Sequence, residues 1–149
     1  MSAPTEAVPR RILVVDDEEG VTRALQRALR REGYQVTACN DPREALALLK
    51  TQAFDVVLSD HLMPGMTGLE LTKLVRDRYP DMLRMMLTGQ PDTDLLIQAI
   101  NHGEVYRFVT KPWDDLELKV TLSFAFEHLE AQREQRRVGA MVRRWNTYF

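Results

Sequence analysis

The fold is decided by the stretch from Val56 to Leu71, which reads VVLSDHLMPGMTGLEL. It begins with an apolar run that ends at a lone acid, Asp60, and a loop containing Pro64 and Gly65 follows. From Leu69 onward the apolar residues take up helical spacing. The stretch therefore predicts a short buried strand, a polar residue at its carboxyl end, and a helix after the loop.

The same unit, a strand followed by a helix, recurs along the chain. Gly33 and Gly103 stand where helix C-caps are expected, and Pro80 ends the helix that follows Asp60. The last helix is expected to begin near Asp114, and five strands are expected, at residues 12–15, 34–39, 54–59, 82–87 and 105–110. Strict alternation with nearly continuous apolar strands predicts an α/β domain, a doubly wound parallel sheet with helices on both faces.

Composition argues against several classes of protein. The 20 basic residues nearly balance the 22 acidic ones, so we expect no direct nucleic-acid binding. The single cysteine, Cys39, excludes an internal disulfide, and no Cys/His cluster has zinc-finger spacing. No apolar run approaches the roughly 18 residues of a membrane span, and residues 1–10 lack the apolar core of a signal peptide. We therefore expect a cytoplasmic protein, without membrane contact, behind a disordered leader.

Polar residues end most of the expected strands, namely Asp16-Asp17, Asp60, Thr88 and Lys111. Because the carboxyl ends of parallel strands meet at one edge, where such sheets bind ligands, these side chains are expected to converge. Carboxylates at close range repel one another unless a cation neutralises them. Oxygen ligands without His or Cys favour Mg²⁺ and argue against zinc.

This set of groups is suited to phosphoryl transfer. The reaction needs a metal that neutralises charge, a cation, a hydroxyl donor and an in-line nucleophile. An aspartate can itself be the nucleophile and form an aspartyl phosphate. Asp60 stands alone at its strand end, whereas Asp16 and Asp17 are paired for metal binding, so Asp60 is the expected nucleophile.

The stretch from Val56 to Leu71, with Asp16-Asp17 upstream and Thr88-Gly89 and Lys111-Pro112 downstream, resembles the receiver domain of two-component response regulators. The resemblance covers about residues 11–130. It implies the flavodoxin-like strand order 2-1-3-4-5. It also implies a signalling domain, not an enzyme beyond its own phosphorylation and dephosphorylation, whose partner is a histidine kinase or phosphotransfer protein.

The resemblance further implies how the site binds metal and phosphate. Asp60 is expected to be the phosphoacceptor and to contribute to the Mg²⁺ site. Asp17 is expected to be the principal direct ligand, and Asp16 to act mostly through water. The backbone carbonyl of Leu62 is expected to complete the protein's share of the coordination.

Four further residues take their expected roles from the same resemblance. Thr88 would donate a hydrogen bond to the phosphoryl group, and Lys111 would pair with its charge. Phe108 stands where the family has a switch aromatic that turns inward when Thr88 moves. Pro112 stands where the family has a cis-proline that aims Lys111.

Several of these features also have a plainer interpretation. The pair Asp16-Asp17, taken alone, could be a helix N-cap and a first-turn acid. His61 could serve as a general base, but a solvent-exposed loop histidine is the expected state. Leu62 and Gln90 stand where family members often carry polar or charged groups that influence water attack, so the lifetime of the aspartyl phosphate stays open.

Two other functions share part of this pattern. A phosphatase of the haloacid-dehalogenase type also uses an aspartyl nucleophile with Mg²⁺, but that nucleophile lies on an early strand with a second Asp two positions on. The expected nucleophile here is instead at position 60, at the end of the third expected strand. A pseudo-receiver would bind a partner without phosphorylation, and the intact acid set argues against it.

The last helix is expected to extend beyond the receiver domain. Its apolar stripe ends at Leu129, and the sequence is polar from Glu130 to Arg137. We therefore divide the chain into the receiver domain, residues 11–130, and a helical extension or linker, residues 131–149. The extension could be a solvated helix end, a link to an output domain outside this chain, or a homodimer contact that uses Trp145, Tyr148 and Phe149.

Overall fold

The computed structural model describes residues 9–89 and 93–148 and shows the expected alternation of strands and helices. The strands are β1 (Arg11–Val15), β2 (Gln35–Cys39), β3 (Val56–Asp60), β4 (Leu83–Thr88) and β5 (Arg107–Thr110). The helices are α1 (Glu19–Arg30), α2 (Pro42–Leu49), α3 (Gly68–Arg78), α4 (Thr93–Asn101) and α5 (Asp115–Tyr148). Most of the expected leader, Gln90 and Phe149 lie outside the described residues.

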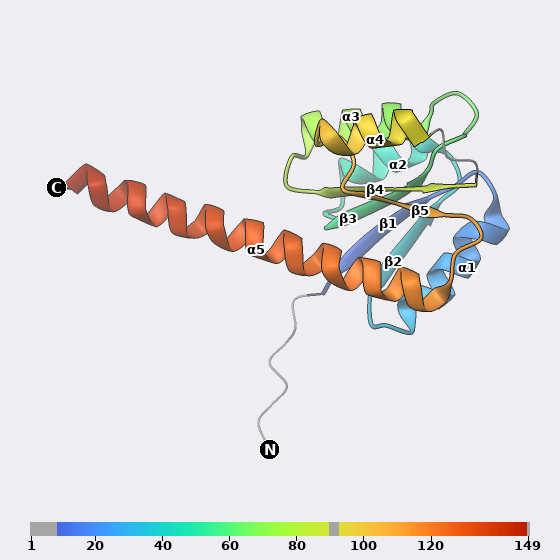
Figure 1. Cartoon of the computed structure of the whole chain (residues 1–149), viewed down its shortest axis with the longest axis horizontal. Coiled ribbons are helices and arrows are strands. Elements are labelled where there is room, and N and C mark those ends of the chain that lie inside the picture. Colours follow the sequence, from blue (N-terminus) through green and yellow to red (C-terminus); the bar gives the residue numbers. More distant parts are fainter. Residues whose placement is uncertain (1–8, 90–92, 149) are drawn as a thin grey trace, which may run out of the picture.

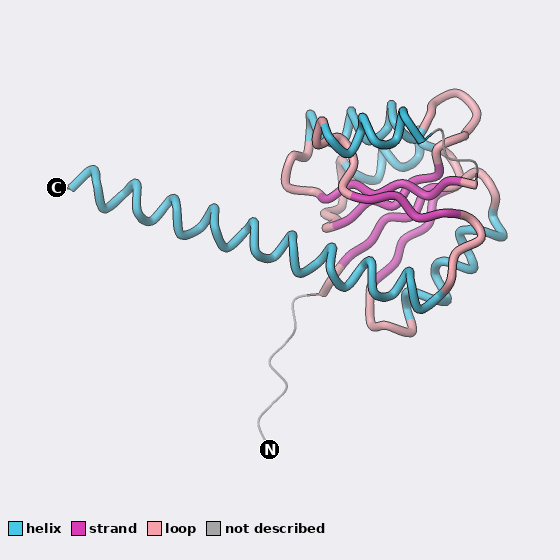
Figure 2. The backbone as a smooth tube through the Cα atoms, in the orientation of Figure 1, coloured by secondary structure: helices cyan, strands magenta, loops and turns pink. Residues whose placement is uncertain are grey.

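The five strands form one parallel sheet in the order β2-β1-β3-β4-β5, which confirms the implied topology. Figures 1 and 2 show α1 and α5 on one face of the sheet and α2, α3 and α4 on the other. The doubly wound α/β architecture is therefore confirmed. The strand order reverses between β1 and β3, and open parallel sheets bind ligands at the carboxyl end of such a reversal.

Each face of the sheet is closed by its own apolar cluster because successive side chains on a strand point to opposite faces. Ile12 and Leu58 face α1 and α5, whereas Leu13 and Val57 face α2 and α3. A third cluster around Met86 joins β4 to α3 and α4. Burial on both faces explains why the central strands read as continuous apolar runs.

The helix starts follow from local sequence. Asp41 caps α2, Thr67 caps α3 and Asp114 caps α5, and each side-chain oxygen accepts a hydrogen bond from a backbone N–H of the first turn. These N–H groups have no partner within the helix, so a capping side chain defines where the helix begins. Gly103 follows α4 with φ +72°, a left-handed conformation that glycine adopts without strain.

α5 contains 34 residues and consists of two unlike halves. The first half, Asp115–Glu130, packs on the sheet, and Leu129 is the last buried residue among the described side chains of the helix. The second half, residues 131–148 and here called the tail, projects beyond the domain (Figure 1). Ion pairs of Arg133 with Asp55 and of Arg136 with Asp81 tie the start of the tail to the body. Neither α5 nor another described helix is long and apolar enough to cross a membrane.

Candidate functional site

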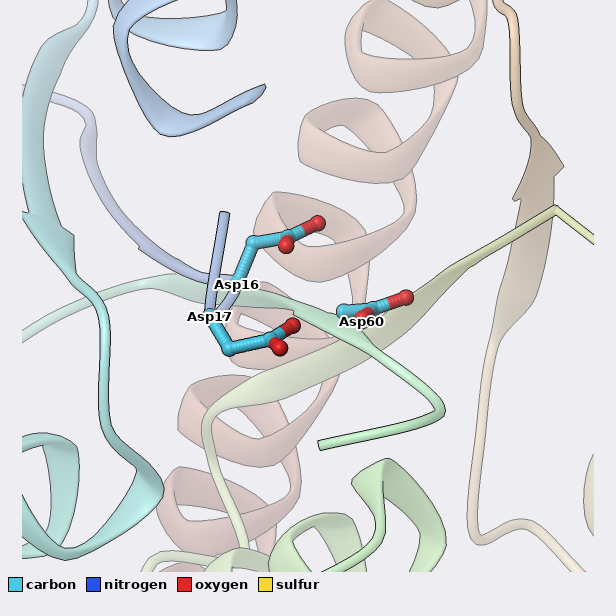
Figure 3. A group of neighbouring side chains, drawn as sticks. All are labelled: Asp16, Asp17 and Asp60. Atoms are coloured by element: carbon cyan, nitrogen blue, oxygen red, sulfur yellow. The ribbon is translucent and has the colours of Figure 1, made fainter. Parts of the chain in front are cut away.

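Three carboxylates meet at the carboxyl edge of the sheet, where the strand order reverses. Asp16 and Asp17 follow β1, and Asp60 ends β3. Figure 3 shows the three side chains gathered at one place. One oxygen of each lies within 4.8 Å of the others. The structure therefore brings together the acids expected to form the site.

Asp16 is fully buried and is held from several sides. Its Oδ1 accepts a hydrogen bond from the Glu18 N–H at 2.9 Å, and its carbonyl oxygen accepts one from Asn40 Nδ2, also at 2.9 Å. The Asn40 amide also lies 3.1 Å from Thr22 Oγ1. The sequence analysis did not assign Asn40 to the site. Because Asn40 directly follows β2, the rule that polar strand ends mark the site would have found it.

Lys111 joins two of the acids. Its Nζ lies 2.6 Å from Asp16 Oδ2 and 3.2 Å from Asp60 Oδ1. Burial disfavours the ammonium form, but the hydrogen bonds and negative charges of Asp16 and Asp60 outweigh burial and raise the pKa of Lys111. The Lys111 N–H donates to the Thr88 carbonyl at 2.7 Å, and the bond to Pro112 is cis, as the resemblance implied. The site therefore contains a fixed positive charge beside the carboxylates.

Asp60 is 6% exposed, and its surroundings act on it in opposite directions. Burial and the charge of Asp16 raise the pKa of Asp60 more than the hydrogen bond and charge of Lys111 lower it. One ammonium cannot neutralise three carboxylates, so a further cation would relieve the repulsion. All the donors are carboxylate oxygens and Asp17 is open to solvent, which fits a hard divalent ion that keeps water ligands.

The loop after Asp60 brings the first turn of α3 against the end of β3. The Gly68 N–H donates to the His61 carbonyl at 2.8 Å. A Cβ at position 68 would lie 2.9 Å from His61 Cα and would collide with the carbonyl oxygen of Asp60. Only glycine allows this close approach, a requirement that the sequence analysis did not identify. In the same loop, the Leu62 side chain is 64% exposed, and the metal-binding role of its carbonyl stays a prediction.

Thr88 and Phe108 lie on neighbouring strands, on the face that α4 covers. The register pairs Met86 with Phe108, and alternation places Thr88, two residues after Met86, on that same face. Thr88 is 2% exposed, and Phe108 is half-buried against the cluster that contains Met86 and Leu96. The two residues expected to form a switch therefore share one face, and their movement stays a prediction.

The expectation of an exposed loop histidine at His61 is wrong. The residue is 9% exposed. Its N–H donates to the Leu87 carbonyl at 3.1 Å, which continues the ladder between β3 and β4 one residue beyond Asp60. α3 begins over this residue, because Gly68 contacts its backbone. Its Nδ1 is buried without a hydrogen-bond partner in the part of the chain that the structure describes.

Comparison with known proteins places these features in a family. Residues 12–123 match the family described as the response regulator receiver domain. The hydrogenase transcriptional regulatory protein HoxA of Cupriavidus necator is 36% identical over 132 residues, which are 89% of this chain and 27% of HoxA. The DNA-binding transcriptional regulator NtrC of Salmonella typhimurium is 33% identical over 127 residues, 85% of this chain and 27% of NtrC. The chain thus spans 27% of the length of each of these relatives.

Solved structures share the same fold. The signal receiver domain of an HD domain-containing protein from Pseudomonas fluorescens Pf-5 superposes with a TM-score of 0.80 at 38% identity, covering 90% of this chain and 98% of that chain. The beryllofluoride-activated NtrC4 receiver domain dimer superposes with a TM-score of 0.75 at 34% identity, covering 80% of this chain and 98% of that chain. Both similarities extend over nearly the whole of the compared receiver domains.

Proposed function

The chain belongs to the response regulator receiver family, and from that membership we propose that it is a switch in which Asp60 accepts a phosphoryl group. The donor is a histidine kinase or a phosphotransfer protein. The observation that carries the proposal is the position of Asp60 Oδ1, 3.2 Å from Lys111 Nζ and within the cluster of three acids. Asp16 is less suited to attack phosphorus, because both of its carboxylate oxygens are already engaged. The Glu18 N–H donates to its Oδ1, and Lys111 pairs with its Oδ2.

The transfer step uses groups that already converge. A carboxylate oxygen of Asp60 attacks the phosphorus of a phosphohistidine, so that an O–P bond forms while the P–N bond breaks. The leaving imidazole nitrogen keeps the electron pair of the broken bond and takes up a proton. Lys111 pairs with the charge of the phosphoryl oxygens, and the Thr88 hydroxyl donates a hydrogen bond to one of them. Lys111 needs little reorganisation because it already contacts Asp60.

The carboxylates of Asp16, Asp17 and Asp60, together with the backbone carbonyl of Leu62, would hold Mg²⁺. Asp17 would bind it directly and Asp16 mostly through water. When bound, the ion supplies positive charge that offsets the carboxylates and the phosphoryl oxygens. The oxygen-only donor set and the excess of negative charge support this assignment.

The protein acts as a signalling domain in the cytoplasm and turns over only its own phosphate. The receiver domain occupies residues 11–130 and the helical extension residues 131–149. Leu62 is exposed and apolar, so it offers no side-chain group that could orient a water molecule towards the aspartyl phosphate. The apolar side chain therefore favours a longer-lived phosphorylated state, a consequence that decay measurements on a Leu62→Asn variant can check.

Phosphorylation is read out on the face formed by α4, β5 and α5, which Thr88 and Phe108 connect to the site. Such a switch needs two states that bind the phosphoryl group differently. The tail offers a contact for a second copy, because Val138, Met141 and Val142 are 45%, 48% and 52% exposed at helical spacing. Assembly of the compared NtrC4 receiver domain as a dimer supports a homodimer for this chain.

An output domain outside these residues is the second route by which the switch can act. NtrC is described as a DNA-binding transcriptional regulator, and it is much longer than this chain. The expectation that the protein contacts no nucleic acid therefore has no support from its relatives. The tail, which continues from the α4-β5-α5 face, would connect the switch to such a domain.

Intact mass spectrometry after incubation with acetyl phosphate tests the assignment. With Mg²⁺ the wild type should gain the mass of one phosphoryl group, and EDTA should prevent the gain. Asp60→Asn should remain unmodified, because its amide is not a nucleophile. Asp77→Asn, a matched change of an exposed carboxylate on α3, should be modified like the wild type.

Each other outcome removes a specific part of the proposal. Modification of Asp60→Asn at the wild-type rate would show that another residue is the phosphoacceptor. If EDTA does not affect the modification, the proposed dependence on Mg²⁺ is wrong. Turnover of a generic phosphate ester would favour a haloacid-dehalogenase-type phosphatase, and failure of the wild type to bind Mg²⁺ would favour a pseudo-receiver.

A further inference from the structure

His61 is a buried polar residue that the proposed reaction does not use. It is 9% exposed, and its Nδ1 finds no hydrogen-bond partner among the residues that the structure describes. Buried polar atoms nearly always have a partner, and one without a partner is unfavourable. An apolar residue would fill the same space without this disadvantage. We therefore looked for a group that the imidazole could contact in another state of the protein.

The strand register places His61 beside Thr88. Asp60 pairs with Leu87, and the bond from His61 N–H to the Leu87 carbonyl continues this ladder, so the next position of β4 is Thr88. Neighbouring strands are about 4.8 Å apart. His61 and Thr88 are therefore adjacent across the two strands.

The two side chains also share one face of the sheet. Val57 packs towards α2 and α3, and His61, four residues later, has the same alternation. Met86 packs towards α3 and α4, and Thr88, two residues later, follows it. Both residues thus lie under the helices on the face opposite α1 and α5, the face on which Phe108 also packs.

We propose that His61 is a positioning residue for Thr88, an inference that rests on the proposed phosphorylation of Asp60. In the phosphorylated state the Nδ1–H of His61 donates a hydrogen bond to Thr88 Oγ1, while the Thr88 hydroxyl donates its own proton to a phosphoryl oxygen. A threonine hydroxyl has one donor and two acceptor sites, so it can make both bonds at once. Consecutive hydrogen bonds polarise and strengthen one another.

This arrangement explains why a histidine stands beside the phosphoacceptor. The neutral imidazole with its proton on Nδ1 is sufficient, and no proton is gained or lost. In the unphosphorylated state Nδ1 has no hydrogen-bond partner among the residues that the structure describes, which disfavours that state. Phosphorylation draws the Thr88 hydroxyl towards the phosphoryl group, where its oxygen can accept the Nδ1–H of His61. His61 therefore favours the position that Thr88 takes in the phosphorylated state.

A double-mutant cycle tests the inference, with beryllofluoride and Mg²⁺ standing in for the phosphoryl group. Binding to the full chain would be measured by calorimetry at one protein concentration for the wild type, His61→Leu, Thr88→Val and the double variant. His61→Leu should bind about three- to tenfold more weakly, the effect of one lost hydrogen bond. His61→Leu should have no further effect in the Thr88→Val background, which has no hydroxyl to position.

Two more variants separate hydrogen bonding from packing. His61→Asn, whose amide can place a donor near the position of Nδ1, should bind within about twofold of the wild type, well inside the loss that one hydrogen bond accounts for. His61→Phe, which keeps a ring without a donor, should lose as much affinity as His61→Leu and replaces it if that variant does not fold. Thermal unfolding without ligand verifies the fold of each variant.

The outcomes distinguish this inference from the function on which it rests. If the wild type does not bind beryllofluoride, the proposed phosphorylation itself fails. If the wild type binds and the apolar variants bind equally well, His61 only fills space and the inference is overturned. An equal loss in the Thr88 and Thr88→Val backgrounds also overturns it, because His61 would then act without Thr88.

Discussion

The two halves of α5 share a backbone conformation and differ in what surrounds them. In the first half, Leu122 and Phe126 are 0% and 2% exposed in the cluster against the sheet. In the tail, Val138 and Met141 are 45% and 48% exposed, and Figure 1 shows this part of the helix beyond the domain. One continuous helix is thus stabilised by tertiary packing in one half and mainly by local interactions in the other.

The interactions of the tail are chiefly electrostatic. Arg137 pairs with Glu134 one turn earlier, at 2.6 Å. Arg133 reaches Asp55 of the body at 2.9 Å. Exposed ion pairs of this kind contribute little to stability. The packed half therefore supplies the structured turns from which the tail continues, because a helix elongates more easily than it nucleates.

The largest difference is expected between core and tail truncations of similar side chains. Leu122→Ala should lower the free energy of unfolding by about 2–5 kcal/mol, because it leaves a cavity among buried side chains. Met141→Ala should change it by less than about 0.5 kcal/mol, because solvent already surrounds much of that residue. Urea denaturation followed by circular dichroism measures both changes.

Small losses at both positions would show that α5 is not stabilised by packing in either half. A large loss at Met141 would mean that the tail is covered in solution. Dependence of that loss on protein concentration would then identify a second copy as the cover.

A second contrast compares two glycines. Gly68→Ala should lower the free energy of unfolding by about 1–3 kcal/mol, because its Cβ meets the backbone of Asp60 and His61. It should also slow phosphorylation of Asp60 by displacing the end of β3. Gly20→Ala, in α1 with open space around the added Cβ, should be neutral or stabilise by up to about 1 kcal/mol. Denaturation curves and mass spectrometry report the two effects.

Equal stability of the two alanine variants would indicate that α3 can move away from β3. A slow phosphorylation rate in a fully stable Gly68→Ala protein would show, in contrast, that the position of α3 affects the reaction more than it affects the fold.

Only a small effect on stability is expected from removing residues 131–149. The free energy of unfolding should change by less than about 1 kcal/mol, because the loss is limited to exposed ion pairs and exposed side chains. Association should change much more. With beryllofluoride, sedimentation should show a larger assembly for the full chain and a smaller one after truncation. If truncation alters neither assembly nor kinase-driven phosphorylation, the tail is a solvated helix end and the readout lies elsewhere.

Local pattern predicted most of the fold and the members of the acidic cluster. The strands were visible because burial on both faces makes them continuous apolar runs, and the helices because their caps and glycines are local signals. Asp16, Asp17, Asp60 and Lys111 were visible because a polar residue directly after a buried strand must lie at the edge of the sheet. The strand order came from the resemblance, since the residue pattern of a strand does not show which strands lie beside it in the sheet.

The sequence by itself therefore determined the succession of elements and the residues offered to the site. Only the tertiary structure decided which atoms pair: Lys111 with both Asp16 and Asp60, and Asn40 with the backbone of Asp16. It also decided that His61 is buried and that position 68 must be glycine. The physical reason is that periodicity and capping depend on neighbours along the chain, whereas burial, close approach and ion pairing depend on segments that only the folded sheet brings together.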